Sequence, residues 1–84
     1  ALLAAGCGAG DCNWLVEPAE GWRGCLAKIR YNAEPVAAEV RAVPGPGPQP
    51  DLEVRFAEPQ AAVAPGQAVV CFEGDRVLCG GWLK

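Results

Sequence analysis

The 84-residue sequence contains no histidine and no methionine, and it has neither serine nor threonine. Without these residues, neither a Ser–His–Asp nor a Cys–His arrangement for nucleophilic catalysis can be assembled. A zinc site is also disfavoured, because histidine and Cys-x-x-Cys pairs are both missing. The sequence therefore predicts no catalytic residue, no metal ligand and no cofactor bound by this chain.

The sequence also lacks any apolar run near the ~20 residues that a membrane span requires, so we expect no membrane partner. Small apolar residues precede Cys7, as they do at lipoprotein cleavage sites. However, no basic region comes before them, and the run is too short for a signal peptide. We interpret residues 1–7 as a first strand or the edge of an excised piece. The missing initiator methionine leads us to expect a fragment or processed piece of a longer protein.

Cysteine is the one reactive side chain, and it occurs at Cys7, Cys12, Cys25, Cys71 and Cys79. The odd count disfavours a secreted disulfide scaffold, which stays open as the weakest alternative. We expect reduced, mostly buried thiols in a cytoplasmic protein. Cys71 lies in an apolar segment, where burial raises a thiol pKa. Cys79 precedes two glycines and is expected to be more accessible.

Alternating apolar and polar residues predict an all-β chain. Strands are expected over residues 12–16, 25–31, 36–43, 52–56, 68–72 and 76–83. Residues 68–72 are nearly all apolar, which is typical of a strand covered on both faces. Short strands with turn signals between them predict one small six-stranded closed barrel over residues 1–84. Residues 1–11 are expected to be a partly ordered lead-in.

Proline and glycine mark the expected turns. Residues 44–51 are rich in both and predict an exposed loop. Pro59, within Glu58-Pro59-Gln60, is expected to end a strand. Pro65 and Gly66 suit the central positions of a type II turn, because proline presets φ and glycine allows a positive φ. Gly80-Gly81 predicts a bulge or a close backbone approach.

Four basic residues fall on the outward side of the expected strands, and they are Lys28, Arg30, Arg41 and Arg55. On neighbouring strands they would form a basic stripe that contacts phosphates without reading bases, so they are our candidate nucleic-acid-binding residues. The net charge of −3 argues against a strong grip by this chain alone. Glu39 and Glu53 share the face, so cross-strand ion pairs are the competing interpretation. The tryptophans could stack on bases, but we favour their closing the barrel ends; they are Trp14, Trp22 and Trp82.

An ordered set of motifs resembles one family over roughly residues 12–83. The motifs are Asn13-Trp14, Glu17-Pro18, Ala27-Lys28-Ile29-Arg30-Tyr31, Val54-Arg55-Phe56, Glu58-Pro59-Gln60, Ala62-Val63, Pro65-Gly66-Gln67-Ala68-Val69-Val70, Gly74-Asp75, Val77-Leu78 and Gly80-Gly81. In order and spacing they are similar to the C-terminal barrel of the bacterial tRNA 2-thiouridylases. The chain departs from the family at Asn32, usually basic, at Ala57, usually acidic, and at Cys71 and Cys79.

The resemblance implies a six-stranded barrel similar to the second domain of translation elongation factors. It implies a monomeric cytoplasmic parent enzyme that puts sulfur on the wobble uridine of tRNA, using ATP in an N-terminal domain and sulfur from a relay protein. None of the parent's catalytic motifs maps onto this chain. The family's C-terminal domain is an accessory that helps hold tRNA. A barrel that docks protein and makes no RNA contact remains the alternative.

Overall fold

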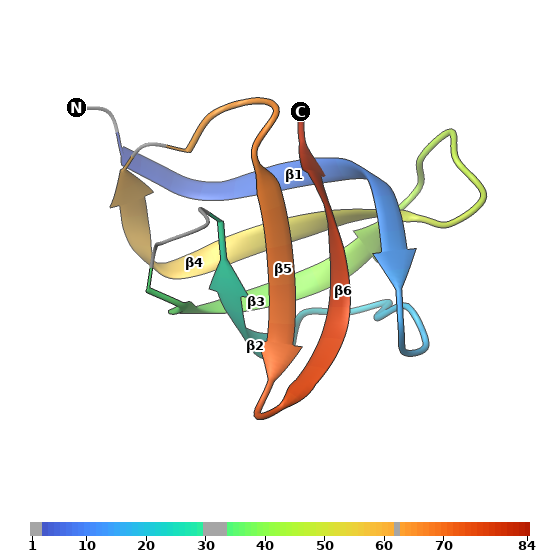
Figure 1. Ribbon diagram of the computed structural model, residues 1–84, viewed down its shortest axis with the longest axis horizontal. Helices are drawn as coiled ribbons and strands as arrows, with labels where there is room; N and C mark the ends of the chain where they lie inside the picture. Colours follow the sequence, from blue (N-terminus) through green and yellow to red (C-terminus); the bar gives the residue numbers. More distant parts are fainter. Residues whose placement is uncertain (1–2, 30–33, 62) are drawn as a thin grey trace.

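Six strands close into an antiparallel barrel in a computed structural model of the protein, which describes residues 3–29, 34–61 and 63–84 (Figure 1). The strands are β1 (Leu3–Trp14), β2 (Arg23–Lys28), β3 (Val36–Val43), β4 (Asp51–Ala61), β5 (Ala68–Glu73) and β6 (Arg76–Leu83). Their order around the barrel is β1-β4-β3-β2-β5-β6, and β6 pairs back with β1. The predicted all-β, six-stranded closed barrel is therefore confirmed. The described residues contain no helix that is long and apolar enough to span a membrane.

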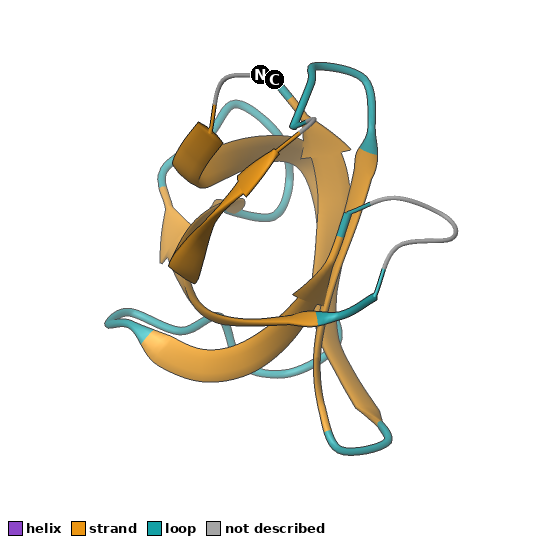
Figure 2. Cartoon of the chain, turned by 90° about the vertical axis from the view of Figure 1, so that its left-hand side faces the viewer, coloured by secondary structure: helices purple, strands orange, loops and turns teal. Residues whose placement is uncertain are grey.

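Alternation along the strands fills the barrel with small apolar side chains. Leu52, Val54 and Phe56 of β4 are at most 8% exposed, as the sequence pattern predicted. Val40 of β3 and Val69 of β5 are fully buried beside them in the same core cluster. Figure 2 shows the strands surrounding the space that these side chains occupy. Burial of this apolar set is the main term that stabilises the barrel.

Strand β1 occupies residues 3–11 of the expected partly ordered lead-in, in agreement with the alternative of a first strand, and residues 1 and 2 lie outside the described residues. It starts at Leu3, pairs with β4 as far as Ala9, and then pairs with β6. Ala9 pairs with both neighbouring strands, and the register with β6 shifts between Gly10 and Asn13, where Asp11 takes a positive φ of 49°. Alternate glycines in this segment carry no side chain, which is why apolar periodicity did not reveal the strand.

Strand β4 continues through Pro59 to Ala61, so the prediction that Glu58-Pro59-Gln60 ends the strand is wrong. Pairing with β3 reaches only Phe56, and β1 resumes its pairing with β4 at Gln60 after a register shift. Pro59 therefore lies in a bulged stretch where its missing N–H removes no ladder hydrogen bond.

The turn predictions hold in most places. Gly66 has a φ of 88° and the Gln67 N–H donates to the Ala64 carbonyl, as a type II turn requires. The exposed Pro/Gly loop ends one residue early, because Asp51 is the first residue of β4. Asp51 is 2% exposed, and its carboxylate forms an ion pair with Lys84.

The three tryptophans have different environments. Trp14 is buried, and its indole N–H donates to the Pro50 carbonyl at 3.0 Å, which anchors the Pro/Gly loop to the barrel. Trp82 is 56% exposed, and Trp22 lies against arginine side chains of the outer wall. Closing the barrel ends is therefore the wrong interpretation for Trp22 and Trp82.

Candidate nucleic-acid interface

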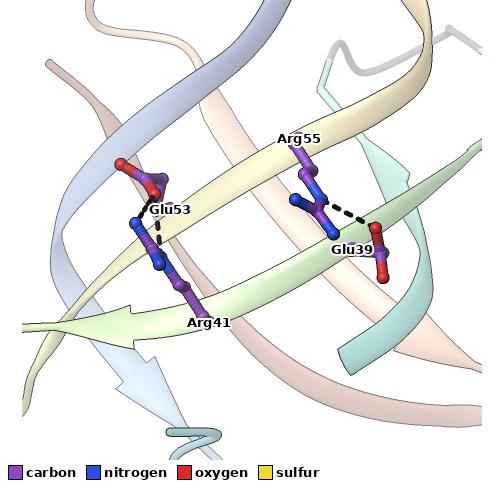
Figure 3. A network of polar contacts seen from close by, with 4 residues as sticks. All are labelled: Glu39, Arg41, Glu53 and Arg55. Atoms are coloured by element: carbon purple, nitrogen blue, oxygen red, sulfur yellow. Dashed lines mark hydrogen bonds and ion pairs between the residues drawn. The ribbon is translucent and has the colours of Figure 1, made fainter. Parts of the chain in front are cut away.

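Two of the four candidate basic residues lie together on the outer face of β3 and β4. Cross-strand register places Arg41 opposite Glu53 and Glu39 opposite Arg55. The Arg41 Nε donates to Glu53 Oε1 at 2.9 Å, and its Nη2 lies 2.6 Å from the same oxygen. The Arg55 Nε donates to Glu39 Oε1 at 2.7 Å (Figure 3). The ion pairs expected as the competing interpretation are therefore present.

Trp22 packs against both arginines. The guanidinium carbons of Arg41 and Arg55 lie 4.5 and 4.3 Å from the centroid of its ring, within cation–π distance. Trp22 belongs to the segment between β1 and β2, and that segment is also held by the Ala42 N–H, which donates to the Ala19 carbonyl at 2.7 Å. The indole is thus a structural support for the guanidinium groups rather than an open platform for a base.

The arrangement still leaves donors for an anion. A guanidinium carries five N–H groups, and the ion pair of Arg55 uses only its Nε. The side chains of Arg41 and Arg55 are 40% and 52% exposed. Together with Glu39 and Glu53 they form a network with no net charge. Such a network can orient a phosphate through fixed donors, but it adds no net positive field.

Lys28 lies apart from this network. In the sheet it is opposite Val70 of β5, and the described residues place no acidic side chain within ion-pair distance of it. The ion pair of Arg55 and Glu39 lies level with Gly24 of β2. Because Lys28 comes four residues after Gly24, it lies about 13 Å from that pair along the strand. Arg30 lies outside the described residues. Within the described part, the basic residues do not form one compact stripe.

The thiols were the other reactive candidates, and all five cysteines are free. Cys71 and Cys79 are direct cross-strand partners and fully buried, so the expected accessibility of Cys79 is wrong. A hydrogen bond with Cys71 lowers the pKa of Cys25, whereas hydrogen bonds with Cys25 and Cys79 together with burial raise the pKa of Cys71. Burial raises the pKa of Cys7 to about 11. In the part of the chain that the structure describes, no acidic and thiol side chains cluster as metal ligands would.

Comparison with known proteins gives a consistent result. A sequence model of the family described as "Aminomethyltransferase beta-barrel domain" matches residues 4–83. The tRNA-specific 2-thiouridylase MnmA of Acidobacterium capsulatum is 43% identical over 74 residues, which cover 87% of this chain and 20% of the relative. Its counterparts in Geobacter metallireducens and Rhodopirellula baltica are each 44% identical over 98% of this chain and 21% of their own length. The chain therefore spans about one fifth of the length of these curated relatives.

Proposed function

Because the chain belongs to the aminomethyltransferase beta-barrel domain family, as the C-terminal barrel of tRNA-specific 2-thiouridylases, we propose that it is a non-catalytic domain that helps such an enzyme hold tRNA. The parent enzyme would thiolate the wobble uridine in the cytoplasm as a monomer. ATP binding and the contact with a sulfur-relay protein would belong to the parts outside this chain.

A non-catalytic role is supported by the reactive groups that the chain offers. It has no histidine, serine or threonine, so no thiol can be paired with an imidazole base. Cys71 and Cys79 are buried, and the pKa of Cys7 is raised to about 11, which keeps that thiol protonated near neutral pH. Among the thiols with a shifted pKa, that of Cys25 alone is lowered, chiefly by its hydrogen bond with Cys71.

The observation that supports RNA contact is the pair of half-exposed guanidinium groups on the β3–β4 wall. Trp22 and the two glutamates hold Arg41 and Arg55 in fixed orientations, so little side-chain entropy is lost when a phosphate is bound. Phosphate contacts position a protein on RNA without reading its sequence. Because the network is neutral, the chain alone should bind tRNA weakly and in a salt-sensitive manner.

The experiment measures binding of the chain to a tRNA transcript over a range of salt concentrations. Arg55→Gln should weaken binding and reduce the slope of log K against log salt by about one, as expected for one lost phosphate contact. Glu39→Gln should strengthen binding, because it releases Arg55 from its neutralising partner. Arg76→Gln is the matched control, because Arg76 carries the same charge at the far β5–β6 turn. Circular dichroism checks that each variant is folded.

Opposite effects of Arg55→Gln and Glu39→Gln would support the proposal. Equal weakening by Arg55→Gln and Arg76→Gln would mean that only net charge matters, and the proposed interface would then be wrong. Lys28→Glu combined with Arg30→Glu tests the remaining candidates in the same assay. Unchanged binding by that double variant would remove both residues from the interface.

A further inference from the structure

The outer face of the barrel over β2, β5 and β6 is apolar, in contrast to the charged β3–β4 wall. Five large apolar side chains on it are 37–59% exposed, and we call them the apolar face: Leu15, Leu26, Val70, Val77 and Trp82. Cross-strand pairs connect them, because Phe72 lies opposite both Leu26 and Val77, and Ala68 lies opposite Trp82. In Figure 1 these strands run side by side at the front of the barrel.

A hollow runs across this face. Its volume is about 310 Å³, and its lining includes Leu15, Val70, Val77 and Trp82 around the paired glycines of β6. Gly81 allows a close approach, as the sequence predicted, because an added Cβ would lie 2.6 Å from Cys12 Sγ and 2.9 Å from the Gly10 carbonyl oxygen. Gly80 lies on the same face as Trp82 and carries no side chain, so Trp82 forms one wall of the hollow. The face is therefore concave and apolar, which is the shape that accepts a protruding side chain.

The composition of β5 indicates that this face is covered in the working protein. Its residues 68–72 are apolar on both sides, as in strands buried on both faces. The barrel alone covers only the inner side, where Val69 and Cys71 are fully buried, and Val70 stays 37% exposed. The expectation of cover on both faces is thus wrong for the chain by itself. Exposed apolar patches of this kind mark interaction sites.

The charges argue against RNA as the occupant. Lys28 lies opposite Val70 in the sheet and brings one positive charge to the apolar face. Asp11 lines the hollow and brings one negative charge. A nucleic-acid surface needs several cations, because phosphate contacts supply most of its affinity. An apolar, nearly uncharged surface matches a protein surface of the same character.

We propose that the apolar face docks against the rest of the polypeptide in a full-length 2-thiouridylase, with an apolar side chain of that part entering the hollow beside Trp82. This rests on the family membership used for the proposed function. The curated relatives are about five times as long as this chain, so the same polypeptide supplies a large surface. A covalent connection keeps that surface at high effective concentration, which favours this occupant over a free partner.

The experiment uses the Geobacter metallireducens relative with its matching segment replaced by this chain, compared with the 84-residue chain alone, and no tRNA is present. The readout is the rate of proteolysis within the barrel, which depends on how much docking stabilises it. Val77→Lys and, separately, Trp82→Lys should leave the proteolysis rate of the chain alone unchanged, because both side chains are already exposed and neither lies opposite a cation. In the fusion, each should speed proteolysis of the barrel about tenfold.

The control in the same fusion is Glu58→Lys, which introduces a lysine at an exposed position of β4 and should leave the proteolysis rate unchanged. Equal rates for wild type and both lysine variants in the fusion would overturn the proposal. It would also be overturned if the chain alone formed a dimer that Val77→Lys dissociates, or if Trp82→Lys abolished binding in the separate tRNA assay of the proposed function. Failure of this docking would leave the tRNA result with Arg55→Gln and Glu39→Gln unaffected, so the two proposals fail separately.

Discussion

Replacing Gly6 with alanine tests the closest contact between β1 and β4. A Cβ at residue 6 would lie 2.3 Å from the carbonyl oxygen of Val54 and 3.3 Å from the Cα of Arg55. Both are backbone atoms of the paired strand, so the strands must separate to relieve the overlap. Gly6 does not have a positive φ, and the substitution therefore tests packing rather than backbone strain.

The expected magnitude follows from two opposing terms. Overpacking costs about 1–3 kcal/mol, whereas replacing glycine with alanine gains about 0.4–1 kcal/mol by restricting the unfolded chain. The net loss of about 1–2 kcal/mol should lower the midpoint of thermal unfolding by roughly 5–15 °C in a domain of this size. Gly8 provides the matched control, because its added Cβ would meet only the Leu52 carbonyl oxygen, at 3.9 Å. Gly8→Ala should therefore raise the midpoint by a few degrees.

Thermal unfolding followed by circular dichroism measures both variants against the parent chain. The reasoning would be refuted if Gly6→Ala unfolded within about 2 °C of the parent, a shift well below the one expected from overpacking. Equal falls in the unfolding midpoint of Gly6→Ala and Gly8→Ala would also contradict it, because the close contact at residue 6 would then contribute nothing to the loss of stability. The expected difference in sign requires β1 to be paired along its first half, where the sequence left a first strand and a partly ordered lead-in both open.

Three further predictions concern the outer wall and the thiols. Trp22→Ala should lower the free energy of unfolding in urea by about 1–2 kcal/mol, because it removes two partly exposed cation–π contacts, and an unchanged midpoint would contradict that packing. In the folded chain, Cys25 should be alkylated by iodoacetamide before the buried Cys79, because its pKa is lowered; mass spectrometry of the modified peptides decides, and equal rates would be the contrary result. The raised pKa of Cys7, about 11 when folded, gives stability that is complete below the unfolded thiol pKa of about 8.5 and is lost as pH rises toward 11. Cys7→Ala should therefore flatten the fall in stability over that range, and parallel pH profiles for the two proteins would refute it.

The sequence predicted the bounds of two strands correctly. The bounds of β3 and β6 agree with the expected residues 36–43 and 76–83, because apolar and polar or small residues mark their two faces. The pattern did not reveal the paired strand over residues 3–11, because alternate glycines there show no apolar period. It also wrongly ended a strand at Pro59, whose missing N–H costs no hydrogen bond in a bulge. Both segments become strands because of their backbone hydrogen bonds, and only the assembled sheet determines which N–H and C=O groups are paired.

The candidate site was likewise predictable from the sequence only in part. Strand parity by itself placed Arg41 and Arg55 on the outer surface and put Glu39 and Glu53 beside them, because successive side chains in a strand point to opposite faces. The residue types also show that this chain has no histidine that could act as the base for a nucleophile. Tertiary structure decided which charges meet, since strand order and register set the neighbours. It also brought Trp22 onto the two guanidinium groups and left one side of β5 uncovered, because contacts between distant segments arise only when the barrel closes.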